Sequence, residues 1–223
     1  MSLHPITQFM RKTTRIFEDL GFEIALGPEI ETERYNFDLL NVSADHPARD
    51  LQNTFFLENN KILRTHTSSV QIRAMEKRKP PVRIIVPGRC FRNEATDSNH
   101  DTTFYHLECF AIDRELCMGH LVWTIEHYLK EVYGSYIQIR KRPHFYPFVE
   151  PGMDIDIKFG EKWVEMLGSG MIHPQVLKNM GVDPERFSGF AFALGIDRLA
   201  MLYYNIPDIR LFYSNDLRFL KQF

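Results

Sequence analysis

The chain has 223 residues and a hydrophobic content of 44%, a composition that is typical of a folded globular protein and excludes a disordered or fibrous chain. Its 27 basic and 29 acidic residues give a net charge of −2. Without a basic surface, any nucleic acid must be held locally or by a partner protein. No apolar run is long enough to span a membrane and no signal peptide is recognisable, so we expect a cytoplasmic protein without a membrane contact. The three cysteines lack the spacing of metal ligands, which favours reduced thiols.

The hydrophobic pattern predicts a succession of helices and strands along the whole chain. In chain order they are a helix over 6–20, a strand over 22–31, a loop over 32–50, a hairpin of 55–57 with 61–64, a helix from about 68, a long hairpin over 87–112, a helix over 115–134, strands over 136–140, 144–150, 153–157, 162–167 and 189–194, and a helix from Ile196. Proline cannot donate a hydrogen bond to a strand ladder, so Pro28 and Pro147 exclude central ladder positions. We therefore expect 22–31 at a sheet edge or a subunit boundary.

The long hairpin carries a distinctive polar pattern. Its first strand is predicted to include Arg92 and Glu94, and its second strand carries Phe104, His106 and Glu108. Alternate residues of a strand share a face, so the residues of each set point the same way. If the two faces coincide, a guanidinium, two carboxylates, an aromatic ring and an imidazole meet in one place, and burying them without a ligand is costly. The alternative is an exposed Arg–Glu pair of little energetic consequence.

Three further segments admit both a structural and a functional interpretation. Ser68 or Ser69 fits the N-cap of a helix, with His66 in the preceding loop, whereas the free amides of that helix start fit a bound anion. Glu165 lies in an apolar strand and needs a partner, which is either a cation in a salt bridge or a metal-bound phosphate. Arg198 stands in the first turn of a helix, where it opposes the helix dipole and requires an anion such as phosphate.

A set of motifs extends over nearly the whole chain: HPARD at 46–50, RTHTS at 64–68, FRNE at 91–94, FVEP at 148–151, GMIHP at 170–174, GFAFALGIDRLAML at 189–202 and IPDIRLF at 206–212. Together they resemble the catalytic domains of bacterial phenylalanyl-tRNA synthetase α subunits, a family of class II aminoacyl-tRNA synthetases. The resemblance implies an α+β fold with an antiparallel sheet flanked by helices, in one catalytic domain over 1–223. It also implies an ATP- and Mg²⁺-dependent ligase that forms an aminoacyl adenylate of phenylalanine or a related amino acid and transfers the amino acid to tRNA.

The resemblance assigns roles in ATP binding to individual residues. Arg92 resembles the arginine that holds the α-phosphate and the substrate carboxylate, and Arg198 resembles the arginine on the γ-phosphate side. Glu94 resembles the acceptor for the adenine amino group, and Phe104 resembles the ring that stacks on adenine. Glu165 is the candidate magnesium ligand, because a hard cation prefers oxygen ligands.

The same resemblance assigns the amino-acid site. The ammonium and carboxylate groups are expected to contact His66, Ser68, His106 and Glu108, and the side chain to contact Tyr146, Phe148, Ala191 and Ala193. Glu108 completes the expected catalytic set with the two arginines. Four positions depart from the family pattern, with His106 in place of glutamine, Cys109 in place of glycine, Tyr146 in place of phenylalanine and Ala193 in place of glycine. By strand parity Cys109 faces away from the site, but the other three change a pocket whose added polar groups select against apolar substrates.

The segment around Pro28 resembles the dimer element of class II synthetases, so we expect a homodimer, and association with a synthetase β subunit is a second expectation. The resemblance begins at His4 and lacks the N-terminal extension with which α subunits reach tRNA, so tRNA is an open choice of acceptor. A trimmed domain and a short paralog both fit. Two alternatives stay open: a paralog with another amino acid or a non-tRNA acceptor, and a non-catalytic regulatory relative.

Overall fold

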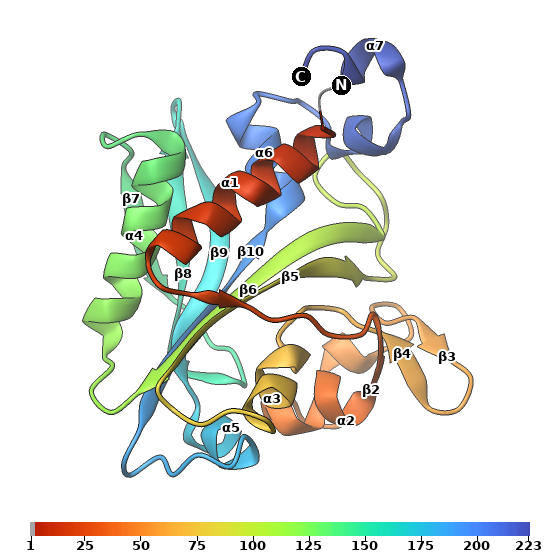
Figure 1. Ribbon diagram of the computed structural model, residues 1–223. Helices are drawn as coiled ribbons and strands as arrows, with labels where there is room; N and C mark the ends of the chain where they lie inside the picture. The colour runs from red at the N-terminus through yellow and green to blue at the C-terminus, as the bar shows by residue number, and fades with distance from the viewer. Residues whose placement is uncertain (1–2) are drawn as a thin grey trace.

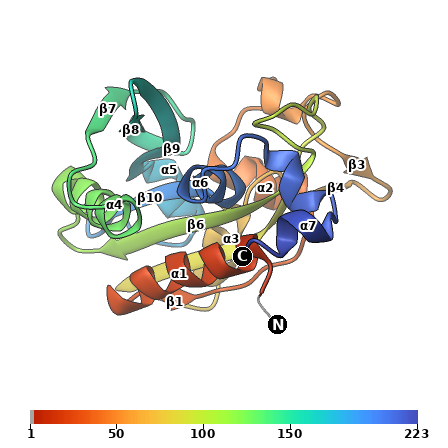
Figure 2. The same ribbon diagram turned by 90° about the horizontal axis from the view of Figure 1, so that it is seen from above.

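The computed structural model describes residues 3–223, which form a large sheet with helices on both faces (Figures 1 and 2). The strands are β1 (Glu23–Ile24), β2 (Ile30–Thr32), β3 (Phe56–Leu57), β4 (Lys61–Leu63), β5 (Val82–Phe91), β6 (Thr103–Asp113), β7 (Ile139–Pro143), β8 (Val149–Phe159), β9 (Lys162–Ile172) and β10 (Ser188–Gly195). The helices are α1 (Pro5–Asp19), α2 (Glu33–Asn36), α3 (Ser69–Met75), α4 (Met118–Tyr133), α5 (Pro174–Asn179), α6 (Ile196–Tyr203) and α7 (Leu217–Leu220). Short 3-10 helices lie in the connections: η1 (Asp38–Leu40), η2 (Pro47–Arg49) and η3 (Ile209–Tyr213).

The large sheet has seven strands in the order β1-β5-β6-β10-β9-β8-β7. Neighbouring strands are antiparallel except for β1 and β5, which pair in parallel at one edge. A small second sheet has the order β2-β4-β3. The predicted α+β architecture, an antiparallel sheet flanked by helices, is therefore confirmed, with one parallel pair at its edge.

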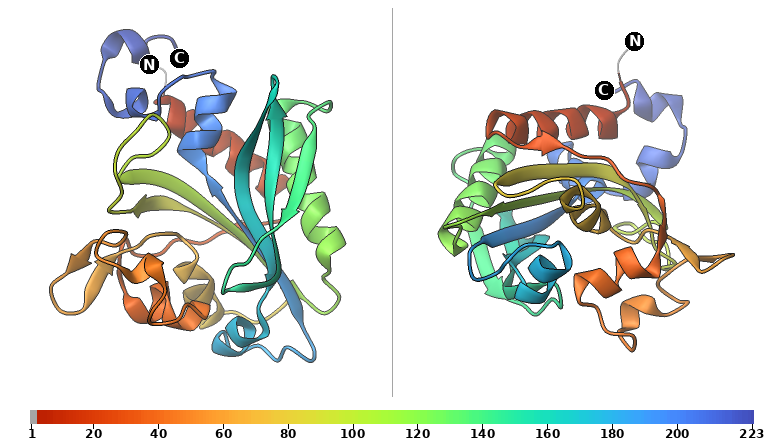
Figure 3. Two further views of the ribbon diagram at one scale, coloured as in Figure 1. Left: turned by 180° about the vertical axis from the view of Figure 1, so that it is seen from behind. Right: turned by 60° about the horizontal axis from the view of Figure 1, so that its bottom comes forward.

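Strand alternation gives each face of the large sheet its own hydrophobic core. On β6, Leu107, Cys109 and Ala111 belong to a core that α1, α4 and α6 share. The intervening Phe110 and Ile112 belong to a second core with α3, α5 and η1. The right-hand view of Figure 3 shows this layering, with the red helix α1 above the sheet and the orange and cyan helical segments below it. Cys109 thus faces the α1 layer, as strand parity predicts.

The hairpins and the two long helices follow the sequence pattern closely. Helix α1 ends at Asp19, and Gly21 follows with a φ of +83°, a conformation that glycine adopts without strain. In the β3–β4 hairpin, Asn59 and Asn60 both have positive φ, as a tight hairpin turn requires. Strands β5 and β6 form the predicted long hairpin, and α4 begins at Met118, a few residues later than expected.

The predicted strand over 22–31 is wrong, because this segment forms two short strands in two different sheets. Strand β1 pairs with β5 of the large sheet, and β2 pairs with β4 of the small sheet. Between them, the carbonyls of Gly27 and Pro28 accept hydrogen bonds from the buried Arg64 guanidinium at 3.0 and 3.2 Å. The segment after β1 therefore bonds to Arg64 and no longer pairs with β5. The predicted loop over 32–50 is also incomplete, since it contains the short helical turns α2, η1 and η2.

The predicted strands over 136–140 and 144–150 are displaced along the chain. Strand β7 begins at Ile139 and β8 begins at Val149, so Tyr146 and Phe148 lie in the connection between them. The β8–β9 pairing shifts register directly after Val149, which breaks the alternation of side chains. Glu150 therefore does not share a face with Tyr146 and Phe148 as predicted. It is exposed, with a carboxylate oxygen 3.3 Å from the Nε2 atom of His173.

The two ends of the described chain lie side by side (Figures 1 and 3). The Nε2 atom of His4 donates to the carbonyl of Phe212 at 2.8 Å, and the amide side chain of Gln8 donates to the carbonyl of Phe223 at 3.4 Å. The apolar C-terminal segment is therefore packed against the start of α1.

Two sequence expectations about cellular environment can be compared with the structure. No helix within residues 3–223 is long and apolar enough to cross a membrane. Cys90, Cys109 and Cys117 are free thiols, and the first two are buried.

Phe17 joins α1 to the core, and its removal tests that core. Its ring centroid lies 5.0 Å from that of Tyr128 and 5.8 Å from that of Phe192. We predict that Phe17→Ala lowers the free energy of unfolding by about 3–5 kcal/mol, because the truncation leaves a cavity. Urea unfolding measures the change. Tyr136→Ala, a truncation at a residue that is 96% exposed, should change it by less than about 0.5 kcal/mol, and equal losses would contradict the assigned core.

Candidate active site

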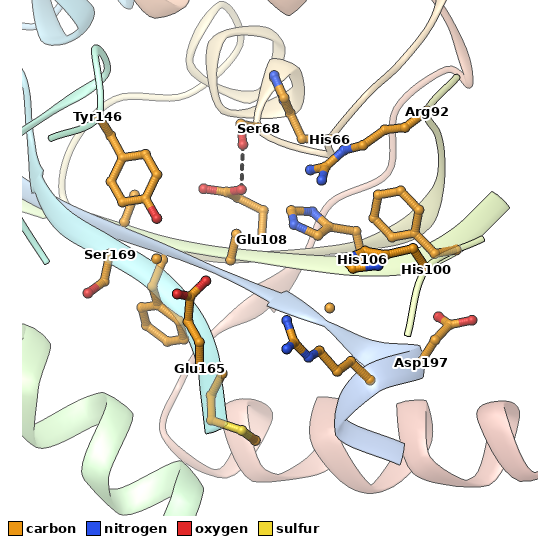
Figure 4. Close-up of a pocket in the computed structure, with 18 of the residues that line it drawn as sticks. His66, Ser68, Arg92, His100, His106, Glu108, Tyr146, Glu165, Ser169 and Asp197 are labelled. Carbon is orange, nitrogen blue, oxygen red and sulfur yellow. Dashed lines mark hydrogen bonds between the residues drawn. The ribbon is translucent and has the colours of Figure 1, made fainter. Parts of the chain in front are cut away.

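A cavity of about 430 Å³ opens on the face of the large sheet that α3 covers (Figure 4). Every residue that the sequence assigned to a site lines it: His66, Ser68, Arg92, Glu94, Phe104, His106, Glu108, Tyr146, Phe148, Glu165, Ala191, Ala193 and Arg198. These residues come from the segment before α3, the β5–β6 hairpin, the connection before β8, strands β9 and β10, and the first turn of α6. The grouping that strand alternation predicted is therefore present, while the role of each residue stays a prediction.

On the α3 side of strand β6, the residues change from apolar to polar along the strand, and the cavity begins at this change. Its residues on the α3 side are apolar at Ile112 and Phe110, where they belong to the core. The next residues on the same face are Glu108, His106 and Phe104, which line the cavity. The polar residues thus begin where the packed core ends.

Arg92 and Glu94 lie beyond the end of β5, one correction to the predicted hairpin. The Arg92 amide still donates to the Thr102 carbonyl at 2.9 Å, so the pairing continues for one residue. Its Nε atom donates to the Thr65 carbonyl at 3.2 Å, and its guanidinium carbon lies 4.9 Å from the centre of the Phe104 ring. The contact to Glu94 is long, at 4.0 Å. A simple exposed Arg–Glu pair therefore does not describe Arg92, whose guanidinium lies over an aromatic ring at the cavity.

Glu108 is a buried carboxylate in the middle of the cavity, with 3% of the residue exposed. The Ser68 hydroxyl donates to its Oε2 atom at 2.5 Å (Figure 4), and the Gln71 amide donates to its Oε1 atom at 2.7 Å. Burial raises the pKa of Glu108 to about 8, although the two hydrogen bonds act in the opposite direction. Ser68 occupies the N-cap position of α3 but makes no capping hydrogen bond. Ser68 is therefore the N-cap residue by position, as the first interpretation predicted, but its hydroxyl binds Glu108 and not the helix start.

Two histidines of the cavity lie in surroundings that disfavour their charged form. The Nδ1 atom of His106 lies 3.0 Å from the Thr67 hydroxyl and 3.3 Å from the Thr67 amide. The Nδ1 atom of His66 is buried and has no hydrogen-bond partner within residues 3–223. Burial, with the neighbouring cations Arg92 and Arg64, lowers the pKa of His66 to about 3 and that of His106 well below its usual value. An unperturbed imidazole titrates near neutral pH, whereas His106 is expected to titrate well below it.

Arg198 and Asp197 stand together at the start of α6. Arg198 is half-buried and lines the cavity, and none of the ion pairs found among residues 3–223 includes it. A cation without a counterion at this helix start favours a bound anion, as the sequence predicted. Asp197 is buried and accepts hydrogen bonds from the Tyr105 amide at 2.6 Å and from the Tyr213 hydroxyl. Burial raises its pKa to about 6, and these contacts fix the start of α6 against β6.

Glu165 lies in strand β9, as expected, but at the rim of the cavity and not buried, since 52% of its side chain is exposed. Its carboxylate is 3.1 Å from the Nη2 atom of Arg142, so the salt-bridge interpretation is correct. Arg142 also donates to Asp156 at 2.7 and 3.0 Å and lies 3.3 Å from Asp154. One guanidinium therefore serves three carboxylates. Within residues 3–223, no three acidic, histidine or cysteine side chains are arranged to hold a metal ion.

Tyr146 forms the wall at the apolar end of the cavity. Its ring stacks on Phe148 with centroids 5.6 Å apart, and it lies over Gly168, where a Cβ atom would come within 2.5 Å of the phenol oxygen. The hydroxyl donates to Asp154 at 2.7 Å. Ala193 is the cross-strand neighbour of Gly168. The phenol that departs from the family pattern is thus satisfied inside the protein and adds no free polar group to this wall.

Four residues that support the site were not found from the sequence: Thr67, Gln71, Asp154 and Asp197. Ser68 and Gln71 are three positions apart at a helix start, which places both side chains on one face and is a usable signal. Asp154 alternates with Asp156 in an otherwise apolar strand, a second signal for paired carboxylates on one face. Thr67 and Asp197 gave no signal, because their partners lie far away in the sequence.

Comparison with known proteins agrees with this geometry. A family model described as tRNA synthetases class II core domain (F) matches residues 1–223. The phenylalanine–tRNA ligase alpha subunit of Alkaliphilus metalliredigens is 47% identical, with 99% of this chain and 68% of the relative covered, and that of Synechocystis is 46% identical, with 99% and 66% covered. The solved pyrrolysyl-tRNA synthetase from Desulfitobacterium hafniense covers 96% of this chain and 75% of its own at a TM-score of 0.74, and its 18% identity supports the fold alone.

The raised pKa of Glu108 predicts how stability depends on pH. Between about pH 4.5 and pH 8 the folded protein keeps a proton on Glu108 that the unfolded chain releases, so this group's contribution to stability falls as the pH rises. We predict that Glu108→Gln removes this component, and that the free energy of unfolding of the parent falls by up to about 5 kcal/mol more than that of the variant across this range.

Urea unfolding at a series of pH values makes the measurement. Glu161→Gln is the matched control, since the Glu161 side chain is 97% exposed and should leave the pH dependence unchanged. Parallel curves for the parent and Glu108→Gln would show that Glu108 is ionised in the folded protein at neutral pH.

Proposed function

The chain belongs to the family of class II tRNA synthetase core domains, and from this premise we propose that it activates an amino acid with ATP and passes it to tRNA. The substrate is phenylalanine or a close relative, and residues 1–223 act as one catalytic domain. The observation that carries the proposal is the meeting, in one cavity, of a buried carboxylate and two cavity-facing arginines, Arg92 and Arg198. These groups suit an ammonium ion and a polyphosphate, the two charged ends of the reacting pair.

The amino acid binds between Glu108 and the aromatic wall. Glu108 and Ser68 receive the ammonium group. The positive charge of this group lowers the pKa of Glu108, so the carboxyl group releases its proton on binding and pairs in its ionised form. His66 lines the cavity next to Ser68 (Figure 4). The side chain extends toward Tyr146 and Phe148, with Ala191 and Ala193 at the sheet surface. Because the Tyr146 hydroxyl is bonded to Asp154, this end suits an apolar ring and supports phenylalanine over a polar substrate.

ATP binds on the side of Arg92 and Arg198. A carboxylate oxygen of the amino acid attacks the α-phosphorus, the bond to the bridging oxygen breaks, and pyrophosphate leaves. Arg92 holds the α-phosphate and aligns the carboxylate, while Arg198 holds the leaving phosphates, so positioned cations stabilise the charge that develops. Adenine stacks on the face of Phe104 that Arg92 leaves free, with Glu94 as the acceptor for its amino group.

Magnesium fits this site as an ion that arrives with the nucleotide. Glu165 offers a carboxylate oxygen at the rim, and residues 3–223 provide no further cluster of protein ligands. Mg²⁺ commonly uses one or two carboxylates together with substrate phosphates, which matches this arrangement. When bound, the ion neutralises phosphate charge, and Glu165 must then exchange its contact with Arg142 for the metal.

Amino-acid-dependent exchange of pyrophosphate into ATP, over all standard amino acids, tests the proposal. We predict exchange with phenylalanine and a loss of at least about 10³-fold in Arg92→Ala, because a cation at a reacting phosphate contributes this much. Arg114→Ala, an exposed arginine after the same hairpin, is the matched control. A mild effect of Arg92→Ala would remove its assigned role.

Other outcomes of the amino-acid panel are equally decisive. Exchange with a different amino acid would assign the altered pocket a new substrate. Silence with every amino acid, both for the chain alone and with a related synthetase β subunit added, would contradict activation and support a non-catalytic role.

The chain also self-associates through the segment over 22–31, and a β subunit joins it, as the alpha-subunit names of the relatives suggest. This segment exposes Ile24, Leu26 and Ile30, and Leu26 is 77% exposed. Exposed apolar side chains that lie close together mark an interface. We predict a dimer in sedimentation at micromolar concentration and a shift to monomer in Leu26→Asp, with Tyr136→Asp as the control. A parent chain that sediments as a monomer would contradict self-association.

A further inference from the structure

We propose that His106 is a donor-only contact for the substrate carboxyl group, with Thr67 holding the ring so that its Nε2–H points into the cavity. The inference rests on the proposed function for the identity of the substrate. It goes beyond that function by assigning one atom, one tautomer and one polarity to a residue whose type differs from the family pattern.

The contacts of the His106 ring determine its tautomer. The Thr67 backbone amide lies 3.3 Å from Nδ1, and an amide N–H can only donate, so Nδ1 is the acceptor. The Thr67 hydroxyl lies 3.0 Å from the same Nδ1 and accepts a hydrogen bond from the Glu108 amide at 3.2 Å. Its own proton is therefore free to donate to Nδ1. In a neutral ring with Nδ1 as acceptor, the proton resides on Nε2.

The surroundings of the ring favour the neutral form. His106 is 6% exposed, and its charged or titratable neighbours are Arg92 after β5, Arg64 and His66 before α3, and Glu108 on β6. Burial and the cations lower the pKa of His106, and Glu108 does not offset them because it is itself protonated near neutral pH. The ring therefore presents the same donor across the physiological range.

The position of the ring selects its target. In Figure 4, the His106 ring lies in the middle of the cavity, with Glu108 on one side and the Arg92 side chain on the other. An N–H donor cannot accept from the ammonium group that Glu108 receives, so its partner must be an oxygen. In the amino acid, the oxygens that Arg92 aligns are those of the carboxylate. Within residues 3–223 the ring's hydrogen bonds are all made to Thr67 through Nδ1, which leaves Nε2 for the ligand.

Two substitutions of His106 distinguish the role of Nε2 from that of Nδ1. Glutamine places an amide donor near the position of Nε2, whereas asparagine places its amide near Nδ1 and leaves the Nε2 position empty. In calorimetry with L-phenylalanine, we expect His106→Gln to bind within a few-fold of the parent and His106→Asn to bind about 10- to 100-fold more weakly, the loss expected for a hydrogen bond to a charged group. His127→Asn, at a half-buried histidine on α4 that does not line the cavity, is the control and should bind like the parent.

A ligand without a carboxylate identifies the target of the hydrogen bond. 2-Phenylethylamine has the ammonium group and the ring of phenylalanine but no carboxyl oxygens, so we expect the parent and His106→Asn to bind it equally. An equal loss for both ligands would overturn the proposal, because it would place His106 at the ammonium group or in the fold. Wild-type affinity of His106→Asn for phenylalanine would also overturn it.

The tautomer is measured without any substrate. In ¹⁵N-histidine-labelled protein, we expect the His106 signals of an unprotonated Nδ1 and a protonated Nε2, unchanged from pH 5 to pH 8. A protonated Nδ1 in the parent overturns the proposal whatever the enzyme does. Absence of any amino-acid binding by a parent chain with the expected tautomer would instead reject the proposed function, and with it the carboxyl target.

Discussion

Glu108 is held by two donors from a single helical turn, the Ser68 hydroxyl and the Gln71 amide, in a place that is almost closed to water. A carboxyl group buried there without these partners would cost several kcal/mol, so the start of α3 and the middle of β6 fix one another. Thr67 adds a third contact between these two segments, since its hydroxyl accepts a hydrogen bond from the Glu108 amide. These hydrogen bonds hold the segment from His66 to Ser68 at the cavity.

The contacts of Glu108 also explain how much of the site the sequence could predict. Strand alternation placed Phe104, His106 and Glu108 on one face, because a period of two persists along a continuous ladder and β5 pairs with β6 from Thr103 to Ile112. The partners Ser68 and Gln71 are 40 and 37 residues away along the chain, and no local pattern connects residues at that distance. The resemblance of whole motifs to a known family assigned Ser68 and Glu108 to one site, but it did not predict their hydrogen bond or the role of Gln71.

Two of the predicted strands were wrong for identifiable structural reasons. The strand expected over 22–31 was interrupted by a buried arginine from elsewhere in the chain, and the strand expected over 144–150 by a shift of register next to Val149. In the first place an irregular stretch separates β1 from β2, and in the second Pro147 and Phe148 form a turn before β8 begins. The choice of ladder partner is tertiary and depends on side chains that sequence patterns cannot bring together. Glu150 lost its predicted neighbours in this way, while Tyr146 and Phe148 reached the cavity from a connection.

Arg142 gives the cavity a property that no single residue has. Its guanidinium is the common counterion of Glu165 at the rim and of Asp154, which holds the Tyr146 hydroxyl at the opposite wall. A positive charge that arrives at Glu165 competes with the arginine there and releases it toward Asp154 and Asp156. We therefore expect a thermodynamic link between the rim and the aromatic wall, because both share Arg142 as a counterion. By reciprocity, a ligand that moves Tyr146 should then change the cation affinity of the rim.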